Sequence, residues 1–231
     1  MRVLVTGGTR GIGLACCRAF SQAGYLVTAL YSKDEESARL AKEQLPQVNF
    51  VRADVACEED VKRVFAEIPS LDVLVNNAGI CHFAQVQDIT LSDWERVMAV
   101  NAGGVFLSVK YAVKKMLERG GAIVNISSVW GVCGGSCESA YSASKGAVIA
   151  FTKAIAKELA PSQITVNCIA PGVIDTSMNA RFSAQEKGEL CSQIPLGRFG
   201  AGEEVAQAAL YLAKARYVTG QVLGVDGGFG A

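Results

Sequence analysis

The sequence predicts an α/β protein in which a doubly wound, parallel sheet of seven strands carries helices on both faces. Seven short apolar segments without polar alternation recur along the 231 residues, as is typical of strands buried on both faces. Longer segments with apolar residues at helical spacing separate them, and this alternation predicts parallel strands joined by helices. The expected strands are residues 3–5, 26–30, 48–51, 71–75, 122–126, 164–169 and 222–225.

Two of the connecting helices are expected to be long. Apolar residues recur at steps of three, four and seven from Leu91 to Leu117, and this segment ends before Gly120. A second long helix is expected from Tyr141 to Pro161, because proline cannot continue a helix. Both helices follow expected strands, as a doubly wound sheet requires.

Composition favours a small-molecule ligand. Twenty-two basic and twenty-two acidic side chains balance, so charge gives no reason to expect nucleic acid or a membrane surface as a partner. No segment resembles a signal peptide or a membrane span, from which we expect a cytoplasmic protein. No linker or repeat interrupts the pattern, so we expect residues 1–231 to form one domain with a small polar lid near residues 176–197.

The eight cysteines are expected to be reduced thiols. None belongs to a Cys-x-x-Cys pair, and most lie among apolar or small residues, where cysteine behaves as a small hydrophobe. Cys133, Cys137 and the single histidine, His82, could approach a metal ion, but a fourth ligand is missing. We therefore expect no metal site.

A glycine-rich turn follows the first expected strand and opens a helix. It reads Thr6-Gly7-Gly8-Thr9-Arg10-Gly11-Ile12-Gly13. Glycines let the backbone turn tightly and approach a pyrophosphate, and a helix N-terminus offers it unpaired N–H groups and the positive end of a dipole. Between a strand and a helix, this pattern predicts dinucleotide binding in a Rossmann-type fold rather than an ordinary turn.

The end of the second strand indicates which dinucleotide is bound. A carboxylate at this position would bind the ribose 2′-hydroxyl of NAD, but the strand tip carries none. Arg10 in the turn, together with Ser32 and Lys33, could instead bind a 2′-phosphate. We therefore expect NADPH or NADP+ as the cofactor. The alternative is that Arg10 and Lys33 are solvated surface charges beside Asp34 and Glu35.

A tyrosine and a lysine form the candidate catalytic pair. Tyr141 and Lys145 lie four residues apart and project from one helix face. A free phenol has a pKa of roughly 10, so a nearby ammonium and a nicotinamide cation must lower it for proton exchange near neutral pH. Ser128, thirteen residues before the tyrosine at a strand end, could hold a carbonyl group. Asn101 is a poor helix former inside the first long helix, so a local distortion that holds water is expected there.

Together these motifs resemble the short-chain dehydrogenase/reductase family along essentially the whole chain, with Asp54-Val55, Asn76-Asn77-Ala78-Gly79 and Pro171-Gly172 in their usual order. The resemblance implies a Rossmann fold, a homotetramer, and catalysis by Ser128, Tyr141, Lys145 and Asn101. It also implies adenine contacts for the Asp-Val pair and nicotinamide contacts for residues 171–176. The motifs and the resemblance together assign to the cofactor Gly7, Thr9, Arg10, Gly11, Ile12, Gly13, Ser32, Lys33, Asp54, Val55, Asn77, Ala78, Gly79, Tyr141, Lys145, Pro171, Gly172, Ile174 and Thr176.

Within the family, segments 194–200 and 218–228 are similar to bacterial 3-oxoacyl-acyl-carrier-protein reductases. Segment 130–140 departs from them, and its Trp-Gly and Ser-Cys-Glu motifs resemble the elongation factor P 5-aminopentanone reductases. We therefore expect Trp130 and Glu138 in the substrate pocket, where a carboxylate would favour a cationic substrate over an acyl thioester. Glu138 could equally complement the dipole of the following helix.

The expected activity is NADPH-dependent reduction of a ketone to a secondary alcohol. The substrate would be a small ketone, an acyl thioester or a modified lysine. Two alternatives are an NAD(P)-dependent dehydrogenase of a sugar alcohol or hydroxysteroid, and a dinucleotide-binding protein without activity. The filled catalytic positions disfavour the second of these. The polar lid segment disfavours a long apolar substrate.

Overall fold

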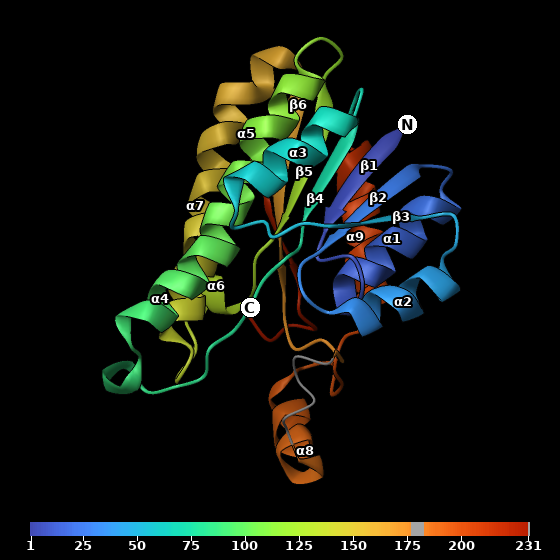
Figure 1. The fold of residues 1–231 in the computed structure, drawn as a ribbon. Coiled ribbons are helices and arrows are strands. Elements are labelled where there is room, and N and C mark those ends of the chain that lie inside the picture. The colour runs from blue at the N-terminus through green and yellow to red at the C-terminus, as the bar shows by residue number, and fades with distance from the viewer. Residues whose placement is uncertain (177–182, 231) are drawn as a thin grey trace.

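A computed structural model describes residues 1–176 and 183–230 (Figure 1). Seven strands form one fully parallel sheet in the order β3-β2-β1-β4-β5-β6-β7, which confirms the predicted fold class. Each strand overlaps its predicted segment. The strands are β1 (Arg2–Thr6), β2 (Leu26–Tyr31), β3 (Asn49–Arg52), β4 (Val73–Asn76), β5 (Gly121–Ile126), β6 (Ile164–Pro171) and β7 (Val222–Val225).

Helices cover both faces of the sheet (Figure 1). One face carries α1 (Gly11–Gln22), α2 (Glu35–Gln44) and α9 (Gly202–Lys214). The other carries α3 (Glu58–Glu67), α4 (Leu91–Met98), α5 (Gly104–Met116), α6 (Trp130–Cys133) and α7 (Ser139–Leu159). No helix in the described part of the chain is long and apolar enough to cross a membrane.

The strands are apolar throughout because each faces a hydrophobic core on both sides. In β1, Val3 and Val5 point into the core beneath α1 and α9, whereas Leu4 points into the core beneath α3, α5 and α7. All three side chains are at most 1% exposed. Alternate residues of one strand therefore supply two cores, which removes the polar alternation expected of a sheet with one wet face.

The first predicted long helix is continuous but irregular. A π-helical turn, Ala99–Gly103, joins α4 to α5, and Asn101 lies at its centre. The distortion that the sequence predicts at this asparagine is therefore one wide turn, a feature that is frequent at functional sites. The second predicted long helix is α7, which is regular over Ser139–Leu159.

The strand order places a ligand crevice at one edge of the sheet. From β1 the chain winds outward through β2 and β3, then crosses back to β4 and winds the other way. At this switch point the loops after β1 and β4 separate, which leaves a crevice at the carboxyl ends of the strands. The helix α8 (Ala184–Gln193) extends below this edge, away from the sheet (Figure 1). It lies within the predicted lid, of which residues 177–182 fall outside the described chain.

Candidate active site

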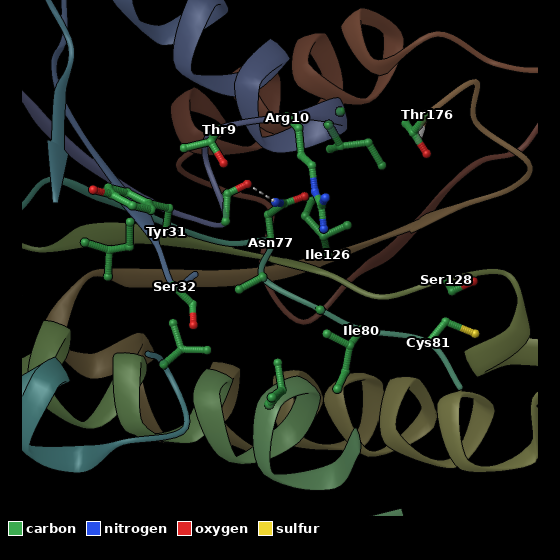
Figure 2. A pocket seen from close by; sticks show the side chains of 18 of the residues that line it. Thr9, Arg10, Tyr31, Ser32, Asn77, Ile80, Cys81, Ile126, Ser128 and Thr176 are labelled. Atoms are coloured by element: carbon green, nitrogen blue, oxygen red, sulfur yellow. Dashed lines mark hydrogen bonds between the residues drawn. The ribbon is translucent and has the colours of Figure 1, made fainter. Parts of the chain in front are cut away.

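A cavity of about 770 Å³ opens at the carboxyl ends of the strands. Figure 2 shows Tyr31 and Ser32 at one end of it and Cys81 and Ser128 at the other. Every residue that the sequence assigns to the cofactor lines this cavity except Gly13, and Ser128 lines it as well. Four predicted site residues do not line it: Gly13, Asn101, Trp130 and Glu138.

The glycine-rich turn is held close to the loop after β4. The Asn77 side-chain amide donates to the backbone oxygens of Thr6 at 3.1 Å and Gly7 at 3.0 Å. A Cβ on Gly13 would lie 2.1 Å from the Gly7 oxygen, so only glycine allows this packing. No side chain caps the N-terminus of α1, which begins at Gly11. Its first N–H groups meet the cavity in an arrangement that fits a dinucleotide pyrophosphate.

The tip of β2 brings together the charges that the sequence indicates for a 2′-phosphate. Arg10 extends from the turn into the cavity (Figure 2), which Ser32 and Lys33 also line. Asp34 lines it too, but this carboxylate caps α2 by accepting from the Ser37 N–H at 2.9 Å and hydroxyl at 2.7 Å. These two hydrogen bonds lower the pKa of Asp34. Its Oδ2 also lies 3.3 Å from the Arg10 guanidinium.

The candidate catalytic pair lies on the buried face of α7. Tyr141 is 8% exposed and Lys145 is 3% exposed. The Lys145 ammonium donates to the Ile126 oxygen at 2.8 Å and lies 5.6 Å from the centre of the Tyr141 ring. Burial lowers the pKa of Lys145 to about 8. Burial also raises the pKa of Tyr141, against a smaller lowering by a hydrogen bond with Ser128. Tyr141 is therefore a neutral phenol at neutral pH, suited to donate a proton.

Asn101 braces the site from behind. Its side chain is fully buried, and its amide donates to the Ile80 oxygen at 2.8 Å and to the Ser144 hydroxyl at 2.9 Å. Its Oδ1 accepts from the Ile80 N–H at 2.8 Å. The asparagine thus connects the loop after β4 to the helix that carries the candidate catalytic pair.

In the segment between Ser128 and Tyr141, neither of the two predicted substrate-pocket residues lines this cavity. Trp130 does not line the cavity, because its indole packs edge to face on Phe229 with ring centres 5.4 Å apart. Glu138 precedes α7, but its side chain makes no capping hydrogen bond there. Its Oε2 instead accepts from the Cys81 thiol at 3.4 Å. Cys81 does line the cavity, so Glu138 lies one residue behind the wall.

Several residues that line the cavity were not predicted from the sequence. Cys81 could have been found, because it closely follows the Asn-Asn-Ala-Gly motif. Arg96 gave no signal, since only the packing of α4 brings it within 3.2 Å of Asp54, 42 residues away. In the described chain, no three His, Cys, Asp or Glu side chains form a metal-binding group. The additional lining residues are Leu30, Tyr31, Asp34, Ala53, Ile80, Cys81, Arg96, Val100, Ile126 and Ser127.

Comparison with known proteins is consistent with this arrangement over nearly the whole chain. A family model described as Enoyl-(Acyl carrier protein) reductase matches residues 7–230. The 3-oxoacyl-[acyl-carrier-protein] reductase FabG of Aquifex aeolicus is 42% identical over 236 residues, which cover 97% of this chain and 95% of that protein. FabG of Thermotoga maritima is 43% identical over 235 residues, with 97% and 96% covered. Carbonyl reductase family member 4 of Danio rerio is 42% identical over 231 residues, with the same coverage.

Proposed function

Because the chain belongs to the short-chain dehydrogenase/reductase family and is an oxidoreductase of keto and hydroxyl groups, we propose that it uses NADPH to reduce a 3-oxoacyl thioester to the 3-hydroxyacyl form. The observation that carries this proposal is that one cavity is lined by Ser128, Tyr141 and Lys145 and also by Arg10, Ser32 and Lys33, with the Lys145 ammonium 5.6 Å from the centre of the Tyr141 ring. The names of the curated relatives support the thioester as the substrate.

The chain's own residues would bind the ketone and supply its proton. The reduced nicotinamide of the bound cofactor would supply the hydride that forms the new C–H bond. Ser128 would hold the carbonyl oxygen in place, and Tyr141 would transfer its phenolic proton to that oxygen. Lys145 would stabilise the phenolate that remains, because a cation close to it favours the charged form. Asn101 would hold the loop after β4 in a fixed position against α7.

Charge at the β2 tip supports NADPH. Arg10 and Lys33 line the cavity there, and the carboxylate of Asp34 is engaged by Ser37 and by Arg10 itself. A 2′-phosphate would exchange with Asp34 for the guanidinium, since phosphate is the more highly charged partner. The predicted homotetramer and the predicted lid over residues 176–197 stay proposals beside this one.

Replacing Arg10 with alanine is expected to weaken NADPH binding about tenfold and NADH binding less than about twofold. The estimate follows from losing one charge-assisted hydrogen bond at an exposed site. Titration of both dinucleotides by protein fluorescence measures it. Lys42→Ala, which removes an exposed charge on α2, is the matched control and should change neither affinity. Equal losses for the two dinucleotides would show that Arg10 does not read the 2′-phosphate.

The position of Glu138 supports a second candidate substrate. Glu138 makes no capping hydrogen bond to α7 and instead contacts Cys81 in the cavity wall, so its carboxylate lies next to the cavity. A negative charge beside the reaction centre would favour a ketone with a nearby amine, such as the 5-aminopentanone group on a lysine of elongation factor P.

Parallel assays of the two substrates separate these proposals. NADPH oxidation is measured with acetoacetyl-acyl-carrier protein and with elongation factor P that bears the 5-aminopentanone group. Turnover of the thioester alone is the expected result. Turnover of the modified protein alone would instead establish the cationic substrate, and then Glu138→Gln should raise the KM for it by about two- to fivefold. Glu158→Gln, at the exposed far end of α7, is the control.

A further inference from the structure

Three backbone oxygens on the buried side of α7 accept hydrogen bonds from side-chain hydroxyl groups. The oxygen of Tyr141 accepts from the Ser144 hydroxyl at 2.7 Å, and that of Lys145 accepts from the Ser127 hydroxyl at 2.8 Å. The oxygen of Val148 accepts from the Thr152 hydroxyl at 2.8 Å. The Ser144 and Thr152 hydroxyls belong to α7 itself, whereas Ser127 belongs to the loop after β5 and attaches the helix to it.

The third of these contacts is the end of a buried chain of hydrogen bonds. The Asn76 amide, at the end of β4, donates to the Asn125 oxygen at 2.9 Å. The Asn125 amide, on β5, donates to the Thr152 hydroxyl at 2.8 Å. Thr152 then donates to the Val148 oxygen, so every donor in the chain points the same way. Two strands and α7 are thus connected through side chains alone.

Burial makes this chain costly to break. Asn125 and Thr152 are 0% exposed and Asn76 is 2% exposed. Loss of the Thr152 hydroxyl would leave the Asn125 amide without an acceptor in an interior that water does not reach. Successive hydrogen bonds in such an interior also strengthen one another. The chain therefore favours one position of α7 against β5.

Resting on the proposed roles of Tyr141 and Lys145, we propose that Thr152 and Asn125 are positioning residues that set the catalytic pair relative to Ser128. Neither Thr152 nor Asn125 lines the cavity. Thr152 lies two helical turns beyond Lys145, about 10 Å along the axis at 1.5 Å per residue. Asn125 precedes Ser128 by three residues on the same strand-to-loop segment. The pair thus joins the two elements whose relative position brings Ser128 to Tyr141.

The test compares three threonine variants. Thr152→Val removes the hydroxyl at nearly constant volume, and Thr152→Ser retains it. Thr165→Val is the matched control, because the Thr165 hydroxyl is buried on β6 without a hydrogen-bond partner in the described chain. For each variant, kcat and KM for a 3-oxoacyl thioester, the Kd of NADPH, and the pH profile of kcat/KM are measured below the unfolding temperature.

Thr152→Val is expected to lower kcat about tenfold, since small misplacements of reacting groups are costly. The Kd of NADPH should change less than twofold, because the cofactor residues are untouched. The alkaline limb of kcat/KM should move to higher pH, since a loosely held Lys145 is better hydrated and keeps its proton longer. Thr152→Ser should recover most of the rate, and Thr165→Val should retain all of it.

Equal behaviour of Thr152→Val and Thr165→Val would overturn the proposal and leave Thr152 a core residue only. If Thr152→Val does not fold, Thr152→Ala, which also lacks the hydroxyl, is expected to show the same loss of kcat, and normal turnover in it would also overturn the proposal. Failure of the proposed function is separate: it would appear as normal turnover in Tyr141→Phe.

Discussion

Phenylalanine in place of Tyr141 is expected to lower the rate of ketone reduction at least about a thousandfold and to leave NADPH binding nearly unchanged. The phenolic O–H is the proposed proton donor, and general acid catalysis contributes about a hundred- to ten-thousandfold. The ring itself is retained in a site where Tyr141 is 8% exposed, so packing survives. Steady-state turnover and a fluorescence titration with NADPH measure the two effects separately.

Tyr217→Phe serves as the control for this experiment. The Tyr217 side chain is fully exposed, so removal of its hydroxyl should affect neither turnover nor affinity. An unchanged unfolding temperature of Tyr141→Phe would show that its loss of rate is chemical. Normal turnover in that variant would contradict the catalytic role of Tyr141 and leave Ser128 as the remaining donor near the carbonyl.

Methionine in place of Lys145 is expected to lower kcat about a hundredfold and to remove part of the pH dependence. The ammonium lies over the Tyr141 ring and would stabilise the phenolate formed when the proton leaves. Methionine has a similar length and lacks the charge, so it fills the space without replacing the function. Rates of ketone reduction at pH 6 to 10 measure the effect. Lys153→Met, on the exposed side of the same helix, is the control.

The sign of the pH dependence follows from the charge that Lys145 must carry. Burial lowers its pKa to about 8, so the ammonium is present below that pH and is lost as pH rises through it. Wild-type kcat/KM for the ketone should therefore be constant at neutral pH and fall on the alkaline side, at or above pH 8. Bound phosphates would move this limb upward, because anions favour the ammonium. A rate that rises through this range, or an identical limb in Lys145→Met, would contradict the assignment.

The order of the elements was predictable from the sequence because it depends on local patterns. Strands such as β1 and β4 are continuous apolar runs, since both of their faces are buried. The glycine-rich turn is recognisable because tight turns and close backbone approaches limit the choice of side chains there. Tyr141 and Lys145 lie four residues apart on one helix, so their proximity needs no tertiary information.

Only the tertiary structure decided which side chains face the cavity. The indole of Trp130, which the sequence predicts in the substrate pocket, packs against Phe229, 99 residues away, and does not line this cavity. The carboxylate of Asp34 follows a strand tip, where sequence alone could not tell a ribose ligand from a helix cap. In the same way, the sequence gives no sign that Thr152 has a special role, and only the structure shows that its hydroxyl accepts from the Asn125 amide.

The difference has a physical cause. Sequence patterns reflect constraints within one element, such as periodic burial and allowed backbone angles, and they are independent of which element packs next to which. The direction of an arginine, an indole or a buried amide depends instead on partners 27 to 99 positions away, as in the Asn125–Thr152, Asp54–Arg96 and Trp130–Phe229 contacts. The sequence by itself determined the fold and the spacing of the candidate catalytic pair, whereas the tertiary structure decided how that pair is held.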